Sequence, residues 1–339
     1  MKMENYWYIA CQSHELQRDQ VIHRKILGEW LALYRDENEK VVALQDRCIH
    51  RNSQLSKGRV KDGKLQCGYH GWVFDGEGKL VHIPSEGPNT QKLGNRCAKR
   101  YETREQQDLI FVCLEVNPDL KLAPFEMPKY HQKGFETVRL FNIFHNNVLN
   151  CAENYVDVPH TVFVHDKIFR VQMNQKIQAE VNRTSGAVHV DYFGEKSNLG
   201  WFSWFLNPSG APIEHRDSFY APNTTSVSYK FGNKEFHITS QSIPIEDQIT
   251  HVYTDLTFNF GIWNKLARPI VRYQGQSVID QDIVALNNQM EVINKYGINF
   301  SNSTADIIHV YIESLREAIE KGEDPRTLSE KKNKIEFWI

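Results

Sequence analysis

The stretches CIHR (residues 48–51) and CGYHGW (residues 67–72) decide the fold of the first part of this chain. Cys48 and His50 form a Cys-x-His pair, and Cys67 and His70 form a Cys-x2-His pair after sixteen intervening residues. Zinc fingers usually place two cysteines before two histidines, so this alternating order argues against a structural zinc site. Two thiolates and two neutral imidazoles instead suit a [2Fe–2S] cluster in which cysteines hold one iron and histidines the other.

These motifs and their flanking residues resemble the Rieske domain of ring-hydroxylating oxygenases. Rieske proteins of the respiratory chain carry an additional cysteine after each ligand pair, and these cysteines form a disulfide. Here the corresponding neighbourhoods read Arg51-Asn52-Ser53 and Gly68-Tyr69, without a spare thiol. The respiratory type is therefore not expected. The remaining cysteines are scattered, which is typical of reduced thiols in the cytoplasm: Cys11, Cys97, Cys113 and Cys151.

The composition sets the broad class of protein. A chain of 339 residues predicts two domains, and its net charge of −2 gives no field that favours nucleic acid. Mean hydropathy is −0.53 and no run of about 18 apolar residues occurs, so no membrane span is expected. The N-terminal residues have no long apolar stretch and no small-residue cleavage site, so we expect a mature cytoplasmic protein.

Residues 1–120 predict an all-β domain made of short strands. The segments 31–35 and 41–45 alternate around a polar turn, which indicates a hairpin. The segment 71–84 predicts a second hairpin that turns at Gly76 and Gly78, and 109–116 predicts a buried strand. We expect the four cluster ligands at the tips of two loops that each follow a strand. Three prolines mark a linker and a domain boundary: Pro118, Pro124 and Pro128.

Residues 121–339 predict an α+β domain. A helical stretch begins at 148–157, and strands are expected at 187–193, 201–206, 225–231, 236–243 and 249–260. Two helices, 277–296 and 305–322, carry apolar residues at helical spacing. The charged tail 330–337 is interpreted as a solvated end. This pattern predicts an antiparallel sheet with helices on one face, and the resemblance implies a helix-grip catalytic domain.

A second candidate metal site lies in the spacing Asp157-x2-His160-x4-His165. A histidine pair alone is more often structural, but behind a Rieske motif this spacing resembles the iron-binding segment of Rieske oxygenases. The resemblance implies that His160 and His165 bind non-haem Fe(II) in a 2-His-1-carboxylate triad. It also implies that Asp157 binds no metal but joins an iron histidine to a cluster histidine of the neighbouring subunit, for which His70 is the match. On a helix, Asp157 and His160 share a face. His165, five residues after His160, would lie on another face, so the helix must end or distort between the histidines. Pro159 is the proposed cause.

The third iron ligand must come from a distant segment. Similar enzymes use an aspartate near the start of a late helix, and Gln281-Asp282 fits that context. Asp280 is the rival, but residues 280 and 282 point about 200° apart on a helix, so only one can serve. Asp282 is preferred because it shares a face with Val278 and Leu286.

The substrate pocket is expected between the two halves of the triad, in an aromatic-rich sheet. The aromatic candidates are Trp201, Trp204, Phe205, Phe219, Phe236, Phe258, Phe260 and Trp263. The polar candidates are Asn154, His237, Gln241, His251 and Tyr273. No arginine stands out as a clamp for a carboxylate.

Over its whole length the chain resembles the terminal oxygenase component of Rieske non-haem iron oxygenases of the vanillate and dicamba O-demethylase type. The resemblance implies O2 as co-substrate and electrons from NAD(P)H through a separate flavin/iron–sulfur reductase or a ferredoxin, because this chain has no nicotinamide or flavin motif. It also implies a homotrimer. We expect hydroxylation or oxidative demethylation of an aromatic or heteroaromatic molecule, with ring cis-dihydroxylation as the alternative. Two further alternatives are an electron carrier without oxygenase activity and a binding protein that keeps only the cavity.

Overall fold

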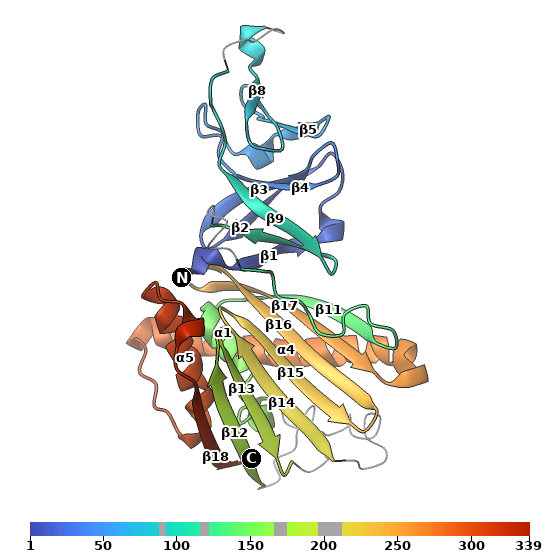
Figure 1. Ribbon diagram of the computed structural model, residues 1–339, viewed down its shortest axis with the longest axis vertical. Coiled ribbons are helices and arrows are strands. Elements are labelled where there is room, and N and C mark those ends of the chain that lie inside the picture. The colour runs from blue at the N-terminus through green and yellow to red at the C-terminus, as the bar shows by residue number, and fades with distance from the viewer. Residues whose placement is uncertain (88–92, 116–121, 166–174, 196–211) are drawn as a thin grey trace. The chain divides into compact units, whose positions relative to one another are not determined.

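The computed structural model describes residues 1–87, 93–115, 122–165, 175–195 and 212–339. These residues form two compact units: Glu4–Glu126, and Met1–Met3 together with Met127–Ile339 (Figure 1). The boundary expected between residues 120 and 121 lies outside the described residues. Among the helices that are described, none is long and apolar enough to cross a membrane.

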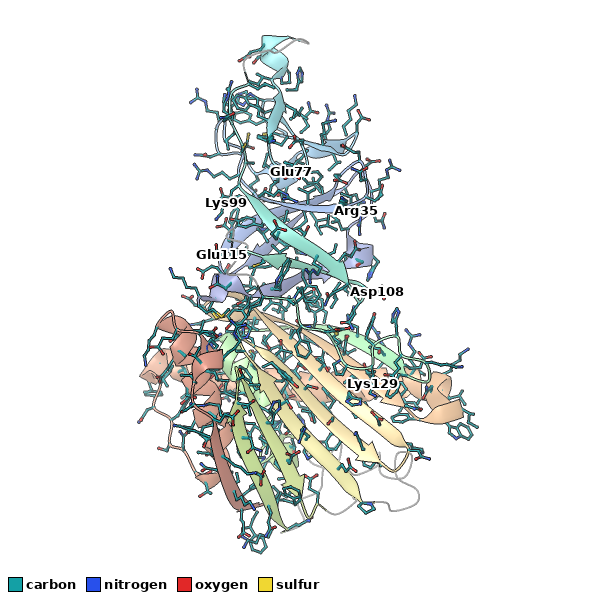
Figure 2. The ribbon with its side chains drawn as sticks, viewed as in Figure 1. Arg35, Glu77, Lys99, Asp108, Glu115 and Lys129 are labelled. Carbon is teal, nitrogen blue, oxygen red and sulfur yellow. The ribbon has the colours of Figure 1, made fainter. Side chains whose placement is uncertain are left out.

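A six-stranded antiparallel sheet forms the larger part of the N-terminal unit, in the order β1-β10-β9-β4-β3-β2. Its strands are β1 (Trp7–Gln12), β2 (Val21–Ile26), β3 (Glu29–Arg35), β4 (Val41–Gln45), β9 (Arg100–Gln106) and β10 (Leu109–Cys113). The hairpin expected at 31–45 is β3 and β4, with Leu33 opposite Ala43. β10 is buried at every position, as its apolar run predicts. Arg35, which is labelled in Figure 2, is the last residue of β3. Its guanidinium donates to both carboxylate oxygens of Glu105 on β9, at 2.9 and 3.0 Å.

A smaller four-stranded sheet completes this unit, in the order β5-β6-β7-β8. It consists of β5 (Arg59–Lys61), β6 (Lys64–Gln66), β7 (Val73–Phe74) and β8 (Leu80–His82). β7 and β8 are the second expected hairpin. Asp75 shapes its turn by accepting the backbone N–H groups of Glu77 and Lys79, each at 2.9 Å. Gly78 has φ +76°, and a Cβ there would lie 2.6 Å from the Ala98 carbonyl oxygen, so the turn requires glycine.

The C-terminal unit is built on an eight-stranded antiparallel sheet in the order β11-β17-β16-β15-β14-β13-β12-β18. The strands are β11 (Glu136–Phe144), β12 (Lys176–Thr184), β13 (Ala187–Phe193), β14 (Ile213–Tyr220), β15 (Thr224–Phe231), β16 (Lys234–Glu246), β17 (Ile249–Asn259) and β18 (Lys331–Trp338). The helices are α1 (Val148–Asn154), α2 (Thr161–Val164), α4 (Asn264–Tyr296) and α5 (Ile307–Glu320). Figure 1 shows α4 running across the sheet, as the α+β prediction requires.

Strand alternation builds the core between this sheet and its helices. Along β17, Val252, Leu256 and Phe258 are buried on one face, where they pack with Val271 and Ile279 of α4. A second apolar cluster joins α5 to β12 and β13, through residues such as Ile312, Val181 and Val188. The face predicted from the alternation of β17 is therefore the face that the helices cover.

The structure differs from the expected elements in three places. α4 begins at Asn264, ahead of the expected residue 277, and contains Pro269. The tail 330–337 is not a solvated end: β18 pairs with β12 over Lys331–Trp338, because Ile335 and Phe337 pack on the core while the lysines face solvent. Strands β11, β12 and β14 were not expected, and the segment 201–206, with Trp201, Trp204 and Phe205, lies outside the described residues.

Candidate metal centres

The Cys48–His50 and Cys67–His70 motifs lie in two adjacent loops, one after β4 and one after β6. Cys48 is 1% exposed and Cys67 is 2% exposed, whereas His70 is exposed to solvent. The imidazole rings of His50 and His70 lie with their centroids 4.5 Å apart. The two imidazoles are therefore adjacent, and the two thiols belong to one buried cluster, with the His70 imidazole at the surface.

Backbone hydrogen bonds fix the shape of both loops. The N–H of Cys48 donates to the Ser53 carbonyl at 2.8 Å, and that of Cys67 donates to the Trp72 carbonyl at 2.9 Å. The Trp72 ring also stacks on His50, with centroids 4.5 Å apart and an interplanar angle of 2°. These contacts hold the ligand side chains in place without using their metal-binding atoms.

Burial and local dipoles set the protonation of these groups. Burial raises the pKa of the Cys48 thiol to about 11, although the backbone N–H groups of His50 and Arg51 favour the thiolate. Desolvation, with smaller effects of His70 and Arg51, lowers the pKa of His50 and keeps it neutral. The buried Nδ1 atom of His50 has no hydrogen-bond partner among the described residues. Two thiols beside two imidazoles fit the donor set of a [2Fe–2S] cluster with mixed ligands.

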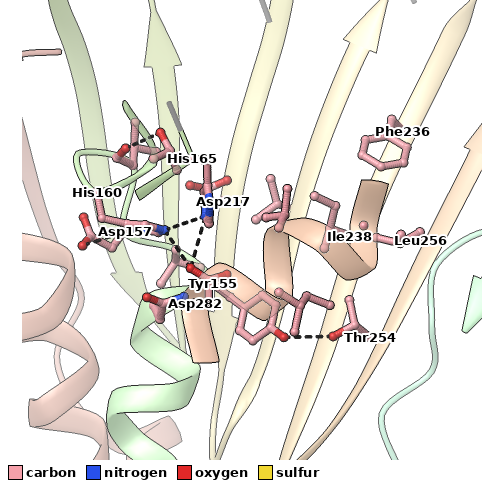
Figure 3. A pocket seen from close by; sticks show the side chains of 18 of the residues that line it. Tyr155, Asp157, His160, His165, Asp217, Phe236, Ile238, Thr254, Leu256 and Asp282 are labelled. Atoms are coloured by element: carbon pink, nitrogen blue, oxygen red, sulfur yellow. Dashed lines mark hydrogen bonds and ion pairs between the residues drawn. The ribbon is translucent and has the colours of Figure 1, made fainter. Parts of the chain in front are cut away.

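A second cluster of ligand atoms lies in the C-terminal unit. The candidate ligand atoms of His160, His165 and Asp282 all lie within 4.8 Å of one another. The Nε2 atoms of His160 and His165 are 3.3 Å apart, and they lie 3.5 and 3.1 Å from Asp282 Oδ1 (Figure 3). The structure thus brings together the two histidines and the preferred aspartate. Asp280, the rival, is exposed and instead accepts from Gln276.

The local backbone explains how both histidines reach one point. The helix expected to carry them ends at Asn154 and resumes as α2, with His160 immediately before its first residue and His165 immediately after its last. The helix therefore ends at Val164, between the two histidines, as the sequence predicted, and a further interruption precedes His160. Pro159 lies in the turn before α2, where its missing N–H breaks no helical hydrogen bond.

Each histidine has a partner for its second ring nitrogen. Asp157 Oδ2 lies 3.5 Å from His160 Nδ1, on the side away from the cluster. His165 Nδ1 lies 2.9 Å from Gln281 Oε1. An amide oxygen can only accept, so Nδ1 of His165 donates to Gln281, and this contact points Nε2 toward Asp282. From the sequence, Gln281 was notable only as the neighbour of Asp282, and this adjacency was the one signal of its place beside His165.

The charges in this cluster fit a cation at its centre. Burial acts to lower the pKa of His160, but Asp157 and Asp282 outweigh it and raise that pKa to about 9. Burial acts to raise the pKa of Asp282, but His160 and His165 hold it below its usual value. Asp282 Oδ1 is buried and accepts no well-aligned hydrogen bond. Two imidazole nitrogens and a carboxylate oxygen that converge in this way form a donor set suited to non-haem iron.

A mostly apolar cavity opens beside this cluster, between α4 and the sheet. Its volume of about 110 Å³ is several times what a single water molecule needs. The lining includes Asn154, Asp157 and the three clustered residues, together with Val227, Tyr229, Phe236, Ile238, Leu256 and Val278. A ligand in this cavity would lie directly against the histidines and Asp282.

Of the five polar residues expected at the substrate, only Asn154 is among the described residues that line this cavity. On β16 and β17 the lining residues are the even-numbered Phe236, Ile238, Thr254 and Leu256. Strand alternation turns Gln241 and His251 to the opposite face, where His251 packs edge-on against Phe141 with centroids 5.2 Å apart. Tyr273 is 77% exposed on the outer side of α4. His237 likewise faces away from the cavity and contacts Glu235 at 2.9 Å.

Most of the expected aromatic residues belong to the core or the surface. Phe236 lines the cavity, while Phe219, Phe258 and Phe260 are buried in apolar clusters. Trp263 is 52% exposed.

Comparison with known protein families gives one match in each of the two units. Residues 6–102 match the Rieske [2Fe-2S] domain family, and residues 144–309 match the vanillate O-demethylase oxygenase C-terminal domain family. The fold resembles that of dicamba monooxygenase bound to dicamba, with a TM-score of 0.78 and 23% identity over 94% of this chain and 97% of that chain. A structure of NdmA from Pseudomonas putida CBB5 with caffeine gives a TM-score of 0.78 at 19% identity, over 96% of this chain and 94% of that one.

Alignments with two known proteins extend over both units of this chain. The dicamba O-demethylase oxygenase component of Stenotrophomonas maltophilia is 26% identical over 95% of this chain and 98% of its own length. Chloroplastic pheophorbide a oxygenase of Oryza sativa subsp. japonica is 33% identical over 91% of this chain, which spans 60% of that protein. The chain spans between 29% and 41% of the length of three further relatives. The fold, the two motifs and both family matches define a Rieske iron–sulfur protein with an oxygenase domain. The chain combines a Rieske [2Fe-2S] domain with an oxygenase C-terminal domain of the vanillate O-demethylase family.

Proposed function

We propose that this chain is a terminal oxygenase that uses O2 to oxidise an aromatic or heteroaromatic small molecule. The observation that carries this proposal is the convergence of His160, His165 and Asp282 on one point at the wall of an apolar cavity. An electron carrier would need only the N-terminal unit, and a binding protein would not need three converging ligands. We also propose that the boundary between the Rieske domain and the catalytic domain lies between residues 120 and 121.

In this proposal Cys48, His50, Cys67 and His70 hold a [2Fe–2S] cluster, and His160, His165 and Asp282 hold a single Fe(II). A facial set of two histidines and one carboxylate leaves open positions on iron, which would supply O2 activation when the metal is bound. The chain itself supplies the remaining functions. Gln281 fixes the tautomer of His165, and the apolar walls exclude water and hold the substrate beside the metal site.

Asp157 is proposed to connect the two kinds of centre across a subunit interface. Its carboxylate already lies beside His160 Nδ1, and a second acceptor oxygen is available for a histidine N–H. We propose that this second partner is His70 of the partner subunit, in a homotrimer. The electrons would come from NAD(P)H through a separate reductase or ferredoxin, and the scattered cysteines favour the cytoplasm as its location.

Metal analysis tests the assignment of ligands. The purified protein should contain three irons per chain, and the reduced cluster should give an EPR signal with a low average g value. Cys48→Ser should abolish that signal. His160→Ala should keep the signal but lose one iron and all turnover. Loss of the cluster in His160→Ala, with a folded protein, would show that the ligands are divided incorrectly.

The type of oxidation is tested separately. We propose monooxygenation, which on a methoxy- or N-methyl-aromatic compound releases formaldehyde. A panel of such compounds should be incubated with the protein, a reductase and NADH. Formaldehyde release coupled to NADH consumption supports this reaction, whereas a cis-diol that carries both atoms of labelled O2 would establish dihydroxylation instead.

A further inference from the structure

One charged residue on the cavity wall has no part in the proposed metal site. Asp217 on β14 lines the cavity among apolar and aromatic residues, including Tyr229, Ile238 and Leu256 (Figure 3). Its side chain is only 2% exposed. A buried carboxylate in such surroundings is costly unless hydrogen bonds or an opposite charge stabilise it.

His215 holds this carboxylate in a fixed direction. The two residues are two positions apart on β14, so their side chains share a face, and His215 Nε2 lies 2.8 Å from Asp217 Oδ1. The imidazole is stacked between Tyr192 and Tyr229, with centroid distances of 4.4 and 4.3 Å. His215 Nδ1 in turn lies 3.0 Å from Glu195 Oε2, so both ring nitrogens face carboxylates and the ring is an imidazolium.

The second oxygen of Asp217 remains for a ligand. Among the described residues, the side chain of Asp217 interacts only with His215, through Oδ1. The other lining residues include two buried amide atoms without a partner, Gln274 Oε1, which accepts, and Asn154 Nδ2, which donates. No lysine or arginine occurs among the described lining residues, and the histidines there are the proposed metal ligands.

We propose that Asp217 determines substrate specificity by accepting a hydrogen bond from an N–H or O–H group of the substrate. The cavity would then select cationic or neutral donor-bearing aromatic compounds and reject aromatic carboxylates. This inference rests on the proposed oxygenase function and narrows its substrate class. A carboxylate placed against Asp217 would add like-charge repulsion in a site from which water is largely excluded.

The test is equilibrium binding of three probes that share a ring and a methoxy group: 4-methoxybenzylamine, 4-methoxybenzamide and 4-methoxybenzoate. Isothermal titration at pH 7 with the iron-loaded protein, without reductase, measures affinity independently of turnover. The amine and the amide should bind about tenfold or more tighter than the benzoate. Tighter binding of the benzoate, or no binding of the amine, overturns the inference.

Two variants separate specificity from stability. Asp217→Asn keeps the shape but removes the charge, and should reduce the preference for the amine over the benzoate by about tenfold or more. The matched control is Asp191→Asn, because Asp191 lies on the neighbouring strand but pairs with Arg216 at 2.6 Å on the solvent side. An unchanged preference in a folded Asp217→Asn protein overturns the inference. If Asp217→Asn does not fold, the preference of the unmodified protein alone decides.

Failure of the oxygenase proposal gives a different result. A chain that binds the probes in the expected order but holds only the cluster iron, or never oxidises a bound probe, would contradict the oxygenase function and leave the specificity of the cavity standing.

Discussion

At the scale of single residues, the two clustered histidines differ in what their second ring nitrogen contacts. His160 Nδ1 lies near the carboxylate of Asp157, whereas His165 Nδ1 lies near the neutral amide of Gln281. A carboxylate can bridge two imidazoles, and an amide oxygen can only fix a tautomer. Substitutions of Asp157 and of Gln281 should therefore cause different defects.

Asp157→Asn should keep both metals and lose most of its turnover. The amide retains the shape of the carboxylate but cannot accept from two imidazole N–H groups equally well. Iron content and the cluster EPR signal should match the unmodified protein, while product formation falls by about tenfold or more. A variant that keeps more than about half of the turnover would exclude the bridging role.

Gln281→Leu should weaken iron binding without affecting the cluster. Leucine fills a similar volume but offers no acceptor to His165 Nδ1, so the ring is no longer held in one tautomer. Loss of such a partner typically lowers metal affinity by about 10- to 100-fold. Titration of the apo-protein with Fe(II) measures the change, and Asn288→Leu, on the exposed side of the same helix, is the control. Equal affinities in the two variants would contradict this role.

At the scale of secondary structure elements, the cavity depends on how closely α4 approaches the sheet. Gly275 lies in the middle of this helix and faces β11 and β17. A Cβ at this position would lie 2.4 Å from Leu256 Cδ1 and 3.3 Å from Leu140 Cδ1. Glycine therefore lets the helix that carries Asp282 pack against the strands that line the cavity.

Gly275→Ala should destabilise the C-terminal unit, although alanine is the better helix former. Crowding in a packed core costs about 1–3 kcal/mol, while the gain in helix propensity is at most about 1 kcal/mol. Thermal unfolding should show a lower midpoint, and substrate binding should weaken as Leu256 is displaced. Adding Leu256→Ala should relieve the crowding, so the two substitutions should be less than additive. Additive losses would show that Leu256 is not the residue that is displaced.

The buried His215 links three neighbouring strands and predicts a pH dependence of stability. Burial acts to lower its pKa, but Asp217 and Glu195 outweigh it and raise the pKa to about 9. An unfolded histidine has a pKa near 6.5, so this contribution is fully present below about pH 6.5 and is lost as the pH rises through 9. The loss amounts to at most about 3 kcal/mol.

This dependence is measured as the unfolding midpoint between pH 6 and pH 10. His215→Gln should be less stable than the unmodified protein at pH 6, and the difference should shrink toward pH 10. Other groups that titrate in this range are common to both proteins and cancel in the difference. A difference that stays constant with pH would mean that the imidazole is neutral in the folded protein.

At the scale of the whole molecule, the proposal requires a closed assembly. A cluster that serves the iron of the next subunit makes a head-to-tail interface, and such an interface must close into a ring. Sedimentation should give three times the 39.6 kDa of one chain. A fully active monomer at working concentration would contradict the assembly.

Mixed assemblies test the electron route directly. His160→Ala chains keep the cluster but lose the iron site, and Cys48→Ser chains keep the iron site but lose the cluster. Each variant alone should be inactive, and their co-expression should restore turnover if electrons cross between subunits. Inactive mixed trimers would place the transfer within one chain.

The sequence by itself determined the parts of this protein that depend on local spacing. The four cluster motif residues, the histidines His160 and His165, and the alternation of β17 are all patterns within a few residues. Cysteine and histidine spacing specifies a ligand set, and alternation specifies a face, because both follow from backbone geometry. For Asp282, resemblance and helix periodicity together predicted the aspartate that lies beside His160 and His165.

Only the tertiary structure decided which side chains meet across the sheet. Asp217 on β14 and Gly275 on α4 both line the cavity, and no local pattern marks either residue. Gln241 and His251 were expected at the substrate because they are polar residues of the sheet, but a shift of one residue along a strand reverses the face. Tyr273 was expected there from its spacing to Asp282, but it lies on the exposed side of α4. The charged tail became strand β18 because β12 offered an unpaired edge and the core accepted Ile335, which depends on contacts remote in sequence.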